Sequence, residues 1–424
     1  MTYDLVIVGA GILGSSVAYL ASLSGLRTAL VERESAPGTH STYRNTGVVH
    51  RPFYIDPRRR RASALASQRS YHFLRSFCAR RGLTWSQVGT LEVAYDEEGA
   101  RRIEDYRRYA IENGMDESEF SVLYDGEIRE AEPHVKGISA FLSLTDAVVS
   151  FRDIAERMAE EAGAKGADLL FRCRADRVED GRVICGEREL RARAVVVAAG
   201  AESFTLAMRM GLRGYAQLHF RGDYWRLSER KAQLFRRNIY TVPRFSDFPF
   251  LDPHIVKRHT GHTEIGPNAF LVPGPYDYTG TLGVMLRNLL GTGEGELAAK
   301  LRLLMSPELL RLVVSDWSVS LFRSSMVRRV SRFAEGISSK DLVERGISGI
   351  RHNLISGEGF VQEPLIYVKG SAVFVLNYNS PGATGSPWYA SQILRLLREH
   401  GLKAESQAMV GSDEELGALN VIEG

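Results

Sequence analysis

The 424-residue sequence predicts an α/β protein made of two interleaved domains, and three segments carry this prediction. Residues 3–31 combine a strand, a glycine-rich turn, a helix and a second strand. Residues 192–201 form an apolar strand that ends on small residues, and residues 372–398 form a strand, a loop with glycines and a helix. Because these segments lie at the start, in the middle and near the end of the chain, the domain they form must be discontinuous. The segments between them supply the second domain.

The first segment contains the turn Gly9-Ala10-Gly11-Ile12-Leu13-Gly14 between a strand and a helix. Gly9 permits the tight turn, Gly11 lets the backbone approach a pyrophosphate, and Gly14 lets the helix and strand pack closely. The helix start adds free N–H groups and a partial positive charge for the phosphates. Glu32 ends the second strand about 20 positions after Gly9, which is the spacing of the acid that binds ribose hydroxyls. The segment therefore predicts a Rossmann-type dinucleotide-binding domain.

The residues after Glu32 favour FAD over NAD as the dinucleotide. A simple NAD domain would continue with another helix and strand after its second strand. Here residues 33–47 form a polar loop with two glycines, Gly38 and Gly47. Such a loop can run along an extended cofactor, and this suits FAD, whose isoalloxazine ring lies far from its adenine.

Two later segments add support for FAD. The strand over residues 192–201 ends on Ala199-Gly200-Ala201, small residues that permit close backbone approach. The loop over residues 377–385 precedes a helix predicted over residues 388–398, so glycines and free N–H groups stand at a helix start. An unrelated sheet strand and a simple strand–loop–helix connection remain the alternatives for these two segments.

The second domain is predicted to be α+β, built on a mostly antiparallel sheet. Its strands are expected over residues 89–95, 220–227, 239–242 and 262–265, and its helices over residues 97–113 and 282–332. The FAD-binding domain then comprises residues 1–82, 147–211 and 340–424, and the substrate domain comprises residues 83–146 and 212–339. Because ligand pockets often lie at domain interfaces, we expect the substrate to bind where the sheet of the second domain covers the flavin.

Composition narrows the function and the location. A formal net charge of +3 lacks the strong basic excess of a nucleic-acid-binding protein. The three cysteines (Cys78, Cys173 and Cys185) are too few and scattered for a disulfide framework or a zinc site, so we predict no metal. No run reaches about 18 apolar residues, and the chain opens directly on a strand. These observations predict a cytoplasmic enzyme.

One charge run leaves an alternative open. Arg58-Arg59-Arg60-Arg61 follows Pro57 and is typical of a solvated helix start. The other interpretation is contact with an anionic membrane surface, worth up to about 1 kcal/mol per charge. Under that interpretation the protein would be peripheral at the inner face of the membrane.

Four groups of motifs stand out along the chain: the Gly9–Gly14 turn with Glu32, Asn45–His50, Phe220–Leu227 with Ile265–Ala269, and Gly349–Arg351 with Pro381–Gly385. Together they resemble the D-amino-acid oxidase/glycine oxidase superfamily of flavoproteins, and most of all its L-2-hydroxyglutarate dehydrogenase (oxidase) family. The chain departs from that family at Arg51-Pro52-Phe53-Tyr54 and at His352-Asn353. Both departures should lie near the substrate, so the substrate is less constrained than the enzyme class.

The resemblance, together with the chemistry of 2-hydroxy-acid oxidation, points to a set of catalytic residues. This reaction needs a base for the hydroxyl proton and a cation for the carboxylate, while the flavin does the redox chemistry. His50 is the candidate base, because a neutral imidazole can titrate near physiological pH. Arg351 is the candidate carboxylate clamp, because a guanidinium binds carboxylates bidentately. Arg221 and Tyr224 are secondary candidates.

Non-covalently bound FAD is expected to contact a larger set of residues, and three more side chains could line the pocket. The expected contacts are Gly9, Gly11, Ile12, Leu13, Gly14, Glu32, Arg33, Ser41, Asn45, Thr46, Gly47, Val178, Ala199, Gly200, Arg351, Gly382, Ala383 and Thr384. The additional pocket residues are Tyr240, His254 and Asn268, for each of which a structural role is the alternative.

The sequence thus predicts an FAD-dependent oxidoreductase that oxidises a small 2-hydroxy acid by hydride transfer to flavin N5. The resemblance implies L-2-hydroxyglutarate as substrate and 2-oxoglutarate as product, with a quinone or oxygen as electron acceptor. One alternative is an amino-acid or amine oxidase similar to glycine or sarcosine oxidase. Another is an electron-transfer flavoprotein subunit that has no substrate of its own.

Overall fold

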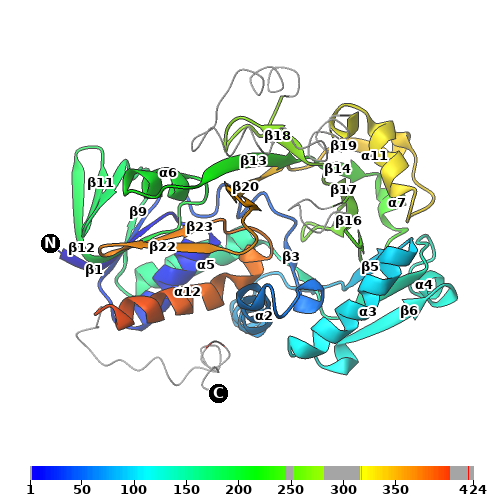
Figure 1. Ribbon diagram of the computed structural model, residues 1–424, viewed down its shortest axis with the longest axis horizontal. Coiled ribbons are helices and arrows are strands. Elements are labelled where there is room, and N and C mark those ends of the chain that lie inside the picture. The colour runs from blue at the N-terminus through cyan, green and yellow to red at the C-terminus, as the bar shows by residue number, and fades with distance from the viewer. Residues whose placement is uncertain (1, 244–251, 281–315, 317, 402–418, 420–424) are drawn as a thin grey trace.

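The computed structural model describes the chain except for residues 1, 244–251, 281–315, 317, 402–418 and 420–424. Figure 1 shows two units side by side. The unit on the left has a sheet above a layer of helices, and the unit on the right has a second sheet flanked by shorter helices. An α/β fold with several sheets is therefore confirmed.

The sheet of the left-hand unit is built around β1 (Thr2–Val8), which lies between β12 (Arg188–Val197) and β2 (Thr28–Val31) and is parallel to both. The strand order is β10-β11-β12-β1-β2-β9, and β23 (Ala372–Leu376) adds a parallel partner to β12. The remaining strands are β9 (Asp168–Leu170), β10 (Arg177–Glu179), β11 (Arg182–Cys185) and β22 (Leu365–Lys369). The three predicted segments thus meet in one sheet, although they are distant in sequence.

Three helices cover one face of this sheet: α1 (Ile12–Leu23), α5 (Phe151–Ala164) and α12 (Gly382–Glu399) (Figure 1). They share one apolar core with the strands, because α1 is buried along almost its whole length. Helix α2 (Arg61–Arg81) packs against α12, and the short α6 (Glu202–Arg209) lies on the other side of the sheet.

The start of α12 differs from the prediction. The helix begins at Gly382 rather than at residue 388, so glycines and Pro387 predicted to lie in or beside a loop are helical. Burial explains the difference: Gly385 lies so close to α2 that a Cβ there would stand 2.8 Å from the Cβ of Ala66. The Trp388 N–H that follows the proline donates to Ser70 Oγ at 3.0 Å. Contacts with α2 therefore offset the low helix propensity of this turn.

The right-hand unit contains an eight-stranded sheet with the order β19-β14-β17-β16-β15-β5-β7-β6. All neighbouring strands are antiparallel except β15 and β5, so the mostly antiparallel sheet is confirmed. The strands are β5 (Thr90–Ala94), β6 (Phe120–Tyr124), β7 (Ser139–Ser143), β14 (Trp225–Leu227), β15 (Asn238–Thr241), β16 (His254–Lys257), β17 (Thr263–Gly266) and β19 (Leu342–Arg345). Both predicted insertions contribute to it.

Flanking this sheet are α3 (Glu97–Glu112), α4 (Gly126–Ala131), α7 (Glu229–Ala232) and α11 (Arg323–Val330). Most of the helix predicted over residues 282–332 lies outside the described residues. Strand β19 follows residue 340, where the predicted boundary returns the chain to the first domain, yet it pairs with β14 of the second unit. Because of this strand pairing, the second unit extends beyond residue 340.

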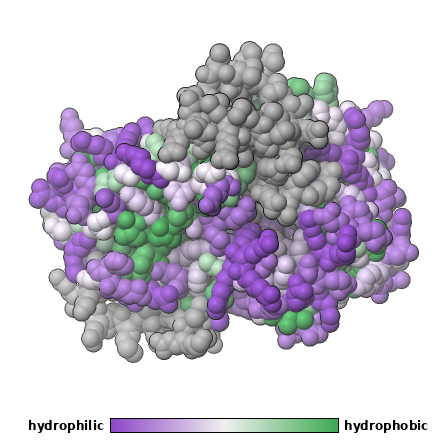
Figure 2. All heavy atoms as spheres, in the orientation of Figure 1, coloured by the Kyte–Doolittle hydropathy of each residue, from purple (hydrophilic) through white to green (hydrophobic). Residues whose placement is uncertain are grey.

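Two smaller sheets lie between the units. One has the order β18-β13-β20-β21, from β13 (Ala216–Gly222), β18 (Phe270–Val272), β20 (Gly349–Ser356) and β21 (Gly359–Phe360). The other joins β3 (Val48–Val49), β8 (Ala147–Val148) and β4 (Ser86–Gln87). Figure 2 shows hydrophilic residues over much of the visible face, with a hydrophobic area on the left-hand unit. No helix among the described residues is long and apolar enough to cross a membrane.

Candidate active site

A cavity of about 330 Å³ runs between the two units. It begins beside the carboxyl ends of β1 and β2, follows the loop over residues 38–50 and reaches the start of α12 and strand β20. The predicted site residues that line it are Gly9, Gly11, Ile12, Leu13, Glu32, Arg33, Ser41, Asn45, Thr46, His50, Ala199, Gly200, Tyr224, Arg351, Ala383 and Thr384. One continuous cavity therefore brings together most of the residues predicted from separate motifs.

The glycine turn forms one wall of this cavity. Gly9 has φ +100°, and a Cβ there would stand 2.6 Å from the Ala198 carbonyl oxygen, so only glycine fits. Gly14 does not line the cavity; a Cβ there would stand 1.8 Å from the Gly9 carbonyl oxygen, which matches its predicted packing role. Gly11 caps α1 and faces the cavity, with Thr42 Oγ1 3.3 Å from where its Cβ would lie. The turn leaves room for a pyrophosphate at the helix start.

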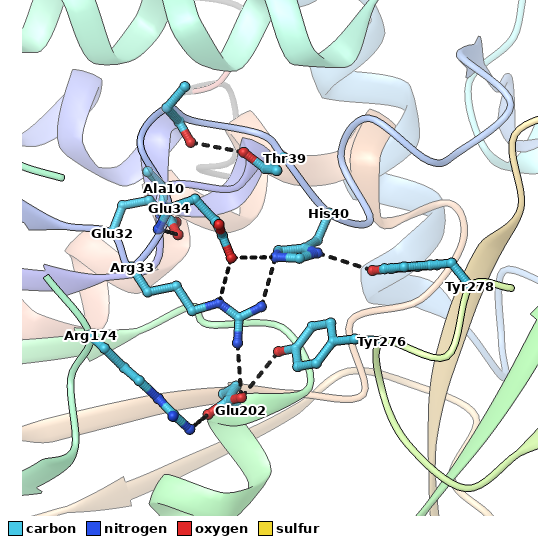
Figure 3. Close-up of polar contacts among 11 residues, drawn as sticks. Ala10, Glu32, Arg33, Glu34, Thr39, His40, Arg174, Glu202, Tyr276 and Tyr278 are labelled. Atoms are coloured by element: carbon cyan, nitrogen blue, oxygen red, sulfur yellow. Dashed lines mark hydrogen bonds and ion pairs between the residues drawn. The ribbon is translucent and has the colours of Figure 1, made fainter. Parts of the chain in front are cut away.

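Glu32 is held at the end of β2 by the backbone around it. Its Oε2 accepts from the Ala10 N–H at 2.8 Å, and its Oε1 accepts from the Glu34 N–H at 2.9 Å (Figure 3). These bonds fix the carboxylate next to the glycine turn, where the ribose of a dinucleotide is expected.

A cluster that the sequence did not indicate lies beside Glu32 (Figure 3). Arg33 pairs with Glu202 at 3.0 Å and lies 4.1 Å from the centre of the Tyr276 ring, while the Tyr276 hydroxyl donates to Glu202 at 3.2 Å. His40 contacts Glu34 at 2.8 Å, and this bond lowers the pKa of the glutamate. Since Glu202 and Tyr276 lie far in sequence from residues 33–40, no local pattern could have added them to this cluster.

Asn45 and its neighbours fix the loop that runs along the cavity. The Asn45 amide donates to the carbonyl oxygens of Ser41 and Thr42, and its Oδ1 accepts from the Gly47 N–H at 2.7 Å. Gly47 does not line the cavity, but its φ of +77° and the Val149 carbonyl 2.6 Å from a Cβ exclude other residues. The loop is therefore rigid where a long cofactor would lie against it.

The opposite end of the cavity lies at the start of α12. Ala383 and Thr384 line it, while Gly382 does not. The first N–H groups of a helix carry partial positive charge, which suits the electron-rich edge of a reduced flavin. A cavity that is continuous from Glu32 and the glycine turn to this helix start, with donor groups along the loop between them, fits an extended dinucleotide such as FAD.

Besides the three glycines named above, four predicted residues do not line the cavity: Val178, Arg221, Tyr240 and His254. Val178 is buried in β10, in the core on the face of the sheet that α6 covers. Arg221 is 3% exposed and pairs with Asp223 at 2.8 Å, while its Nη1 donates to the carbonyl oxygens of Asp277 and Gly280. The geometry gives Val178 and Arg221 a structural environment, so it offers no support for their predicted contacts.

His50 lies at the α12 end of the cavity, directly after β3. Its backbone N–H donates to Thr384 Oγ1 at 3.1 Å, and its ring lies edge-on to Tyr54 and Tyr240. Its side chain is 13% exposed. Burial, together with the positive charge of Arg351, lowers the pKa of His50 to about 4, so the imidazole is neutral at neutral pH.

Arg351 lies on β20, opposite Phe220 of β13, and lines the same end of the cavity. Burial lowers its pKa, and the nearby hydroxyls of Tyr224, Tyr240 and Tyr54 act in the opposite direction. A guanidinium stays charged in proteins, so this end of the cavity combines a fixed cation with a neutral imidazole.

Tyr224 lines the cavity and is held by a buried histidine. Its hydroxyl lies 3.2 Å from His254 Nε2, and the His254 ring stacks on Tyr240 at 4.2 Å between centroids. Burial lowers the pKa of His254 well below its usual value and raises that of Tyr224 to about 12. Both groups are therefore uncharged at neutral pH.

Asn268 and Tyr54 complete the description of this end. Asn268 lines the cavity, yet its amide is used to brace the fold: Oδ1 accepts from the Asp223 N–H, and Nδ2 bonds to Ser320 Oγ. Tyr54 stands in the stretch where the chain departs from the resembling family, and burial raises its pKa. That departure was the signal that could have marked Tyr54 as part of the site.

The cradle at Gly11 leads to a testable prediction. Gly11→Val should yield protein without the yellow flavin colour, because branched methyl groups would occupy the space that a pyrophosphate needs beside Thr42. The measurement is the flavin absorbance per polypeptide after purification and after addition of FAD. Gly357→Val is the control, because nothing lies within 4 Å of its Cβ position. A yellow Gly11→Val protein with wild-type FAD content would contradict this placement.

The fold and the cavity define a class of protein: a flavin-dependent oxidoreductase with a dinucleotide-binding unit and a separate sheet over the reacting end. The chain belongs to the DAO family of FAD dependent oxidoreductases, whose family model matches residues 4–396. FAD is therefore its cofactor.

Relatives and solved structures agree with this family. The chain is 28% identical to an L-2-hydroxyglutarate dehydrogenase of Salmonella houtenae over 91% of its length and 90% of the relative's. It is 26% identical to the mitochondrial L-2-hydroxyglutarate dehydrogenase of Homo sapiens, over 91% and 86% of the two chains. Its fold matches FAD-bound L-α-glycerophosphate oxidase from Mycoplasma pneumoniae with a TM-score of 0.75 at 17% identity, over 94% and 95% of the chains. Glycine oxidase from Geobacillus kaustophilus matches with a TM-score of 0.68 at 17% identity, over 94% and 95%.

Proposed function

We propose that this enzyme oxidises L-2-hydroxyglutarate to 2-oxoglutarate. The observation that carries the proposal is that a neutral imidazole, His50, and a buried guanidinium, Arg351, line the same end of the FAD cavity. An alcohol next to a carboxylate needs both groups: one accepts the hydroxyl proton and the other holds the anion. The relatives matched over about nine-tenths of the chain carry the name of this activity.

Each group of the chain has a defined task in this reaction. Arg351 pairs with the C1 carboxylate and fixes the orientation of C2. His50 accepts the proton of the C2 hydroxyl, and Tyr224 lines the wall that excludes water. When bound, FAD would supply the two-electron oxidation, so that the substrate would lose the hydroxyl proton to His50 and a hydride equivalent from C2.

An amine oxidase acting on a glycine-like or N-methyl amino acid is the second function that the fold admits. The matched glycine oxidase is 17% identical, so that similarity supports the fold alone. The neutral His50 favours the hydroxy acid, because an alcohol needs a base for its proton whereas an amine that is already neutral does not.

The test is anaerobic reduction of the bound flavin. Purified holoenzyme should lose its absorbance near 450 nm when L-2-hydroxyglutarate is added, and 2-oxoglutarate should form in equal amount. D-2-hydroxyglutarate, glycine and sarcosine are the comparison compounds. Bleaching by glycine or sarcosine but not by the hydroxy acid would establish the amine oxidase instead, and no bleaching by any of them would favour an electron-transfer subunit.

We further propose a quinone or oxygen as electron acceptor and a peripheral position at the cytoplasmic face of a membrane. Arg58, Arg59 and Arg61 are exposed at or just before the start of α2. Arg59 lies 3.9 Å from Asp56, and Arg60 pairs with Glu363 at 3.0 Å. Exposed guanidinium groups so close together can approach anionic headgroups. Turnover with oxygen alone, compared with turnover with a quinone in anionic vesicles, distinguishes the two acceptors.

A further inference from the structure

We propose that Asp146 is a positioning residue for His50, orienting the imidazole and stabilising the imidazolium formed when it accepts the substrate proton. This inference rests on the proposed function and extends it to a residue outside the cavity lining. Asp146 Oδ2 lies 3.9 Å from His50 Nδ1, and the aspartate side chain is completely buried.

The register of the small sheet places these two residues together. Strands β3 and β8 are antiparallel, with Val48 opposite Val148 and Val49 opposite Ala147. The next pair in that register is His50 and Asp146. A two-strand pairing holds both backbones, so the carboxylate faces the imidazole through the fold rather than through a flexible loop.

Asp146 is itself held by three donors. Its Oδ2 accepts from Thr90 Oγ1 at 2.8 Å, and its Oδ1 accepts from Ser143 Oγ at 2.7 Å and from the Arg51 N–H at 3.2 Å. Burial raises the pKa of Asp146 to about 6, while these hydrogen bonds act against the rise. The group is therefore mainly a carboxylate at neutral pH, with fixed direction.

The charges around His50 show why such a partner is needed. Arg351 on β20 opposes a positive imidazole, His254 on β16 is neutral, and the rings of Tyr54 and Tyr240 only pack against it. Around Asp146 lie Arg51 and Tyr71, together with Glu92, whose pKa burial raises to about 8. Asp146 is thus the ionised acid nearest to His50 among the described residues that face it.

Proton transfer would be unfavourable if His50 stayed as weak a base as burial makes it. The substrate carboxylate at Arg351 cancels part of the repulsion, and the Asp146 carboxylate attracts the new charge on the ring. Because Nδ1 faces Asp146, the other ring nitrogen, Nε2, is left to accept the hydroxyl proton. A base whose pKa rises toward the operating pH in the complex is the more effective one.

The experiment is a double-mutant cycle on the holoenzyme, read by anaerobic stopped-flow reduction with L-2-hydroxyglutarate across pH. Asp146→Asn should slow reduction by about 10–10³-fold, below the roughly 10⁴-fold seen for the aspartate of a serine protease triad, because 3.9 Å exceeds hydrogen-bond distance. In the His50→Ala background, the same change should alter the residual rate by less than about twofold. Asp180→Asn, at an exposed aspartate bonded to Ser371, is the matched control.

Three outcomes would overturn the inference. Asp146→Asn could reduce its flavin at the wild-type rate at every pH, or it could slow reduction equally with and without His50, as a purely structural residue would. If Asp146→Asn does not retain FAD, the double variant Thr90→Val/Ser143→Ala tests the inference instead. Removing these donors should raise the pKa of Asp146 and move the acid limb of the rate to higher pH, so an unmoved limb overturns the proposal. Absence of flavin reduction in the wild type would instead refute the proposed function, and this inference with it.

Discussion

Replacing His50 with alanine is expected to slow reduction of the flavin by about 10²–10⁴-fold, the usual value of general-base catalysis. The imidazole is neutral because burial and Arg351 lower its pKa to about 4, so it can accept a proton throughout the neutral range. Its side chain lies at the cavity end where the substrate is proposed to bind. The measurement is the limiting rate of anaerobic reduction with L-2-hydroxyglutarate, taken from pH 4 to pH 9.

The pH dependence separates this role from a structural one. Since only the neutral imidazole accepts a proton, the wild-type rate should fall as pH drops through the pKa of His50. A substrate carboxylate at Arg351 raises that pKa, so this fall in the reduction rate should occur at higher pH in the complex than in the free enzyme. His50→Ala should keep its FAD and show no such fall in rate at low pH. A variant that retains the wild-type rate would leave His50 only its packing against Tyr54 and Tyr240.

The second large effect is expected for Arg351→Lys, which should lower kcat/KM by about 30-fold to several-thousand-fold. Lysine offers a point charge on a flexible stem, whereas arginine offers a planar fork matched to two carboxylate oxygens. Poor pairing of a desolvated anion costs on the order of 2–5 kcal/mol. Steady-state kinetics and flavin reduction measure the loss, and FAD content should stay unchanged if the proposed role is with the substrate.

A matched control keeps this result specific. Arg237→Lys changes a guanidinium that pairs with the buried Glu132 at 3.4 Å, away from the cavity, and should leave kcat/KM unaltered. Wild-type kinetics in Arg351→Lys would place the carboxylate clamp elsewhere. Tyr224, which lines the same end of the cavity, and His254, which is hydrogen-bonded to it, would then be the groups to change next.

The cofactor unit was predictable from sequence because its signals are local. The turn from Gly9 to Gly14 constrains the backbone at each glycine, and Glu32 follows at a distance set by one helix and one strand. Such motifs can be recognised in the sequence because the residues that contact one another in them lie within about thirty positions. The motif around Asn45 and Gly47 is local for the same reason, and it places His50 at the end of a braced loop.

Tertiary structure decided the features that depend on pairing between distant segments. Burial against α2 made the Gly382–Pro387 turn helical, although its propensity favours a loop. Arg221 was predicted to contact the substrate, but its guanidinium pairs with Asp223 and donates to two backbone carbonyl groups. Sequence patterns record which face of an element is apolar, but not which distant element covers it.

The sequence by itself therefore determined the fold class, the cofactor and the two residue types that the chemistry requires. Only the tertiary structure decided that Asp146 lies opposite His50, because an antiparallel register between residues about a hundred positions apart sets that contact. The same holds for the tyrosines around Arg351, which come from three separate segments of the chain. Local backbone constraints can be read one segment at a time, whereas the environment that sets the pKa of a buried group exists only after the segments have packed together.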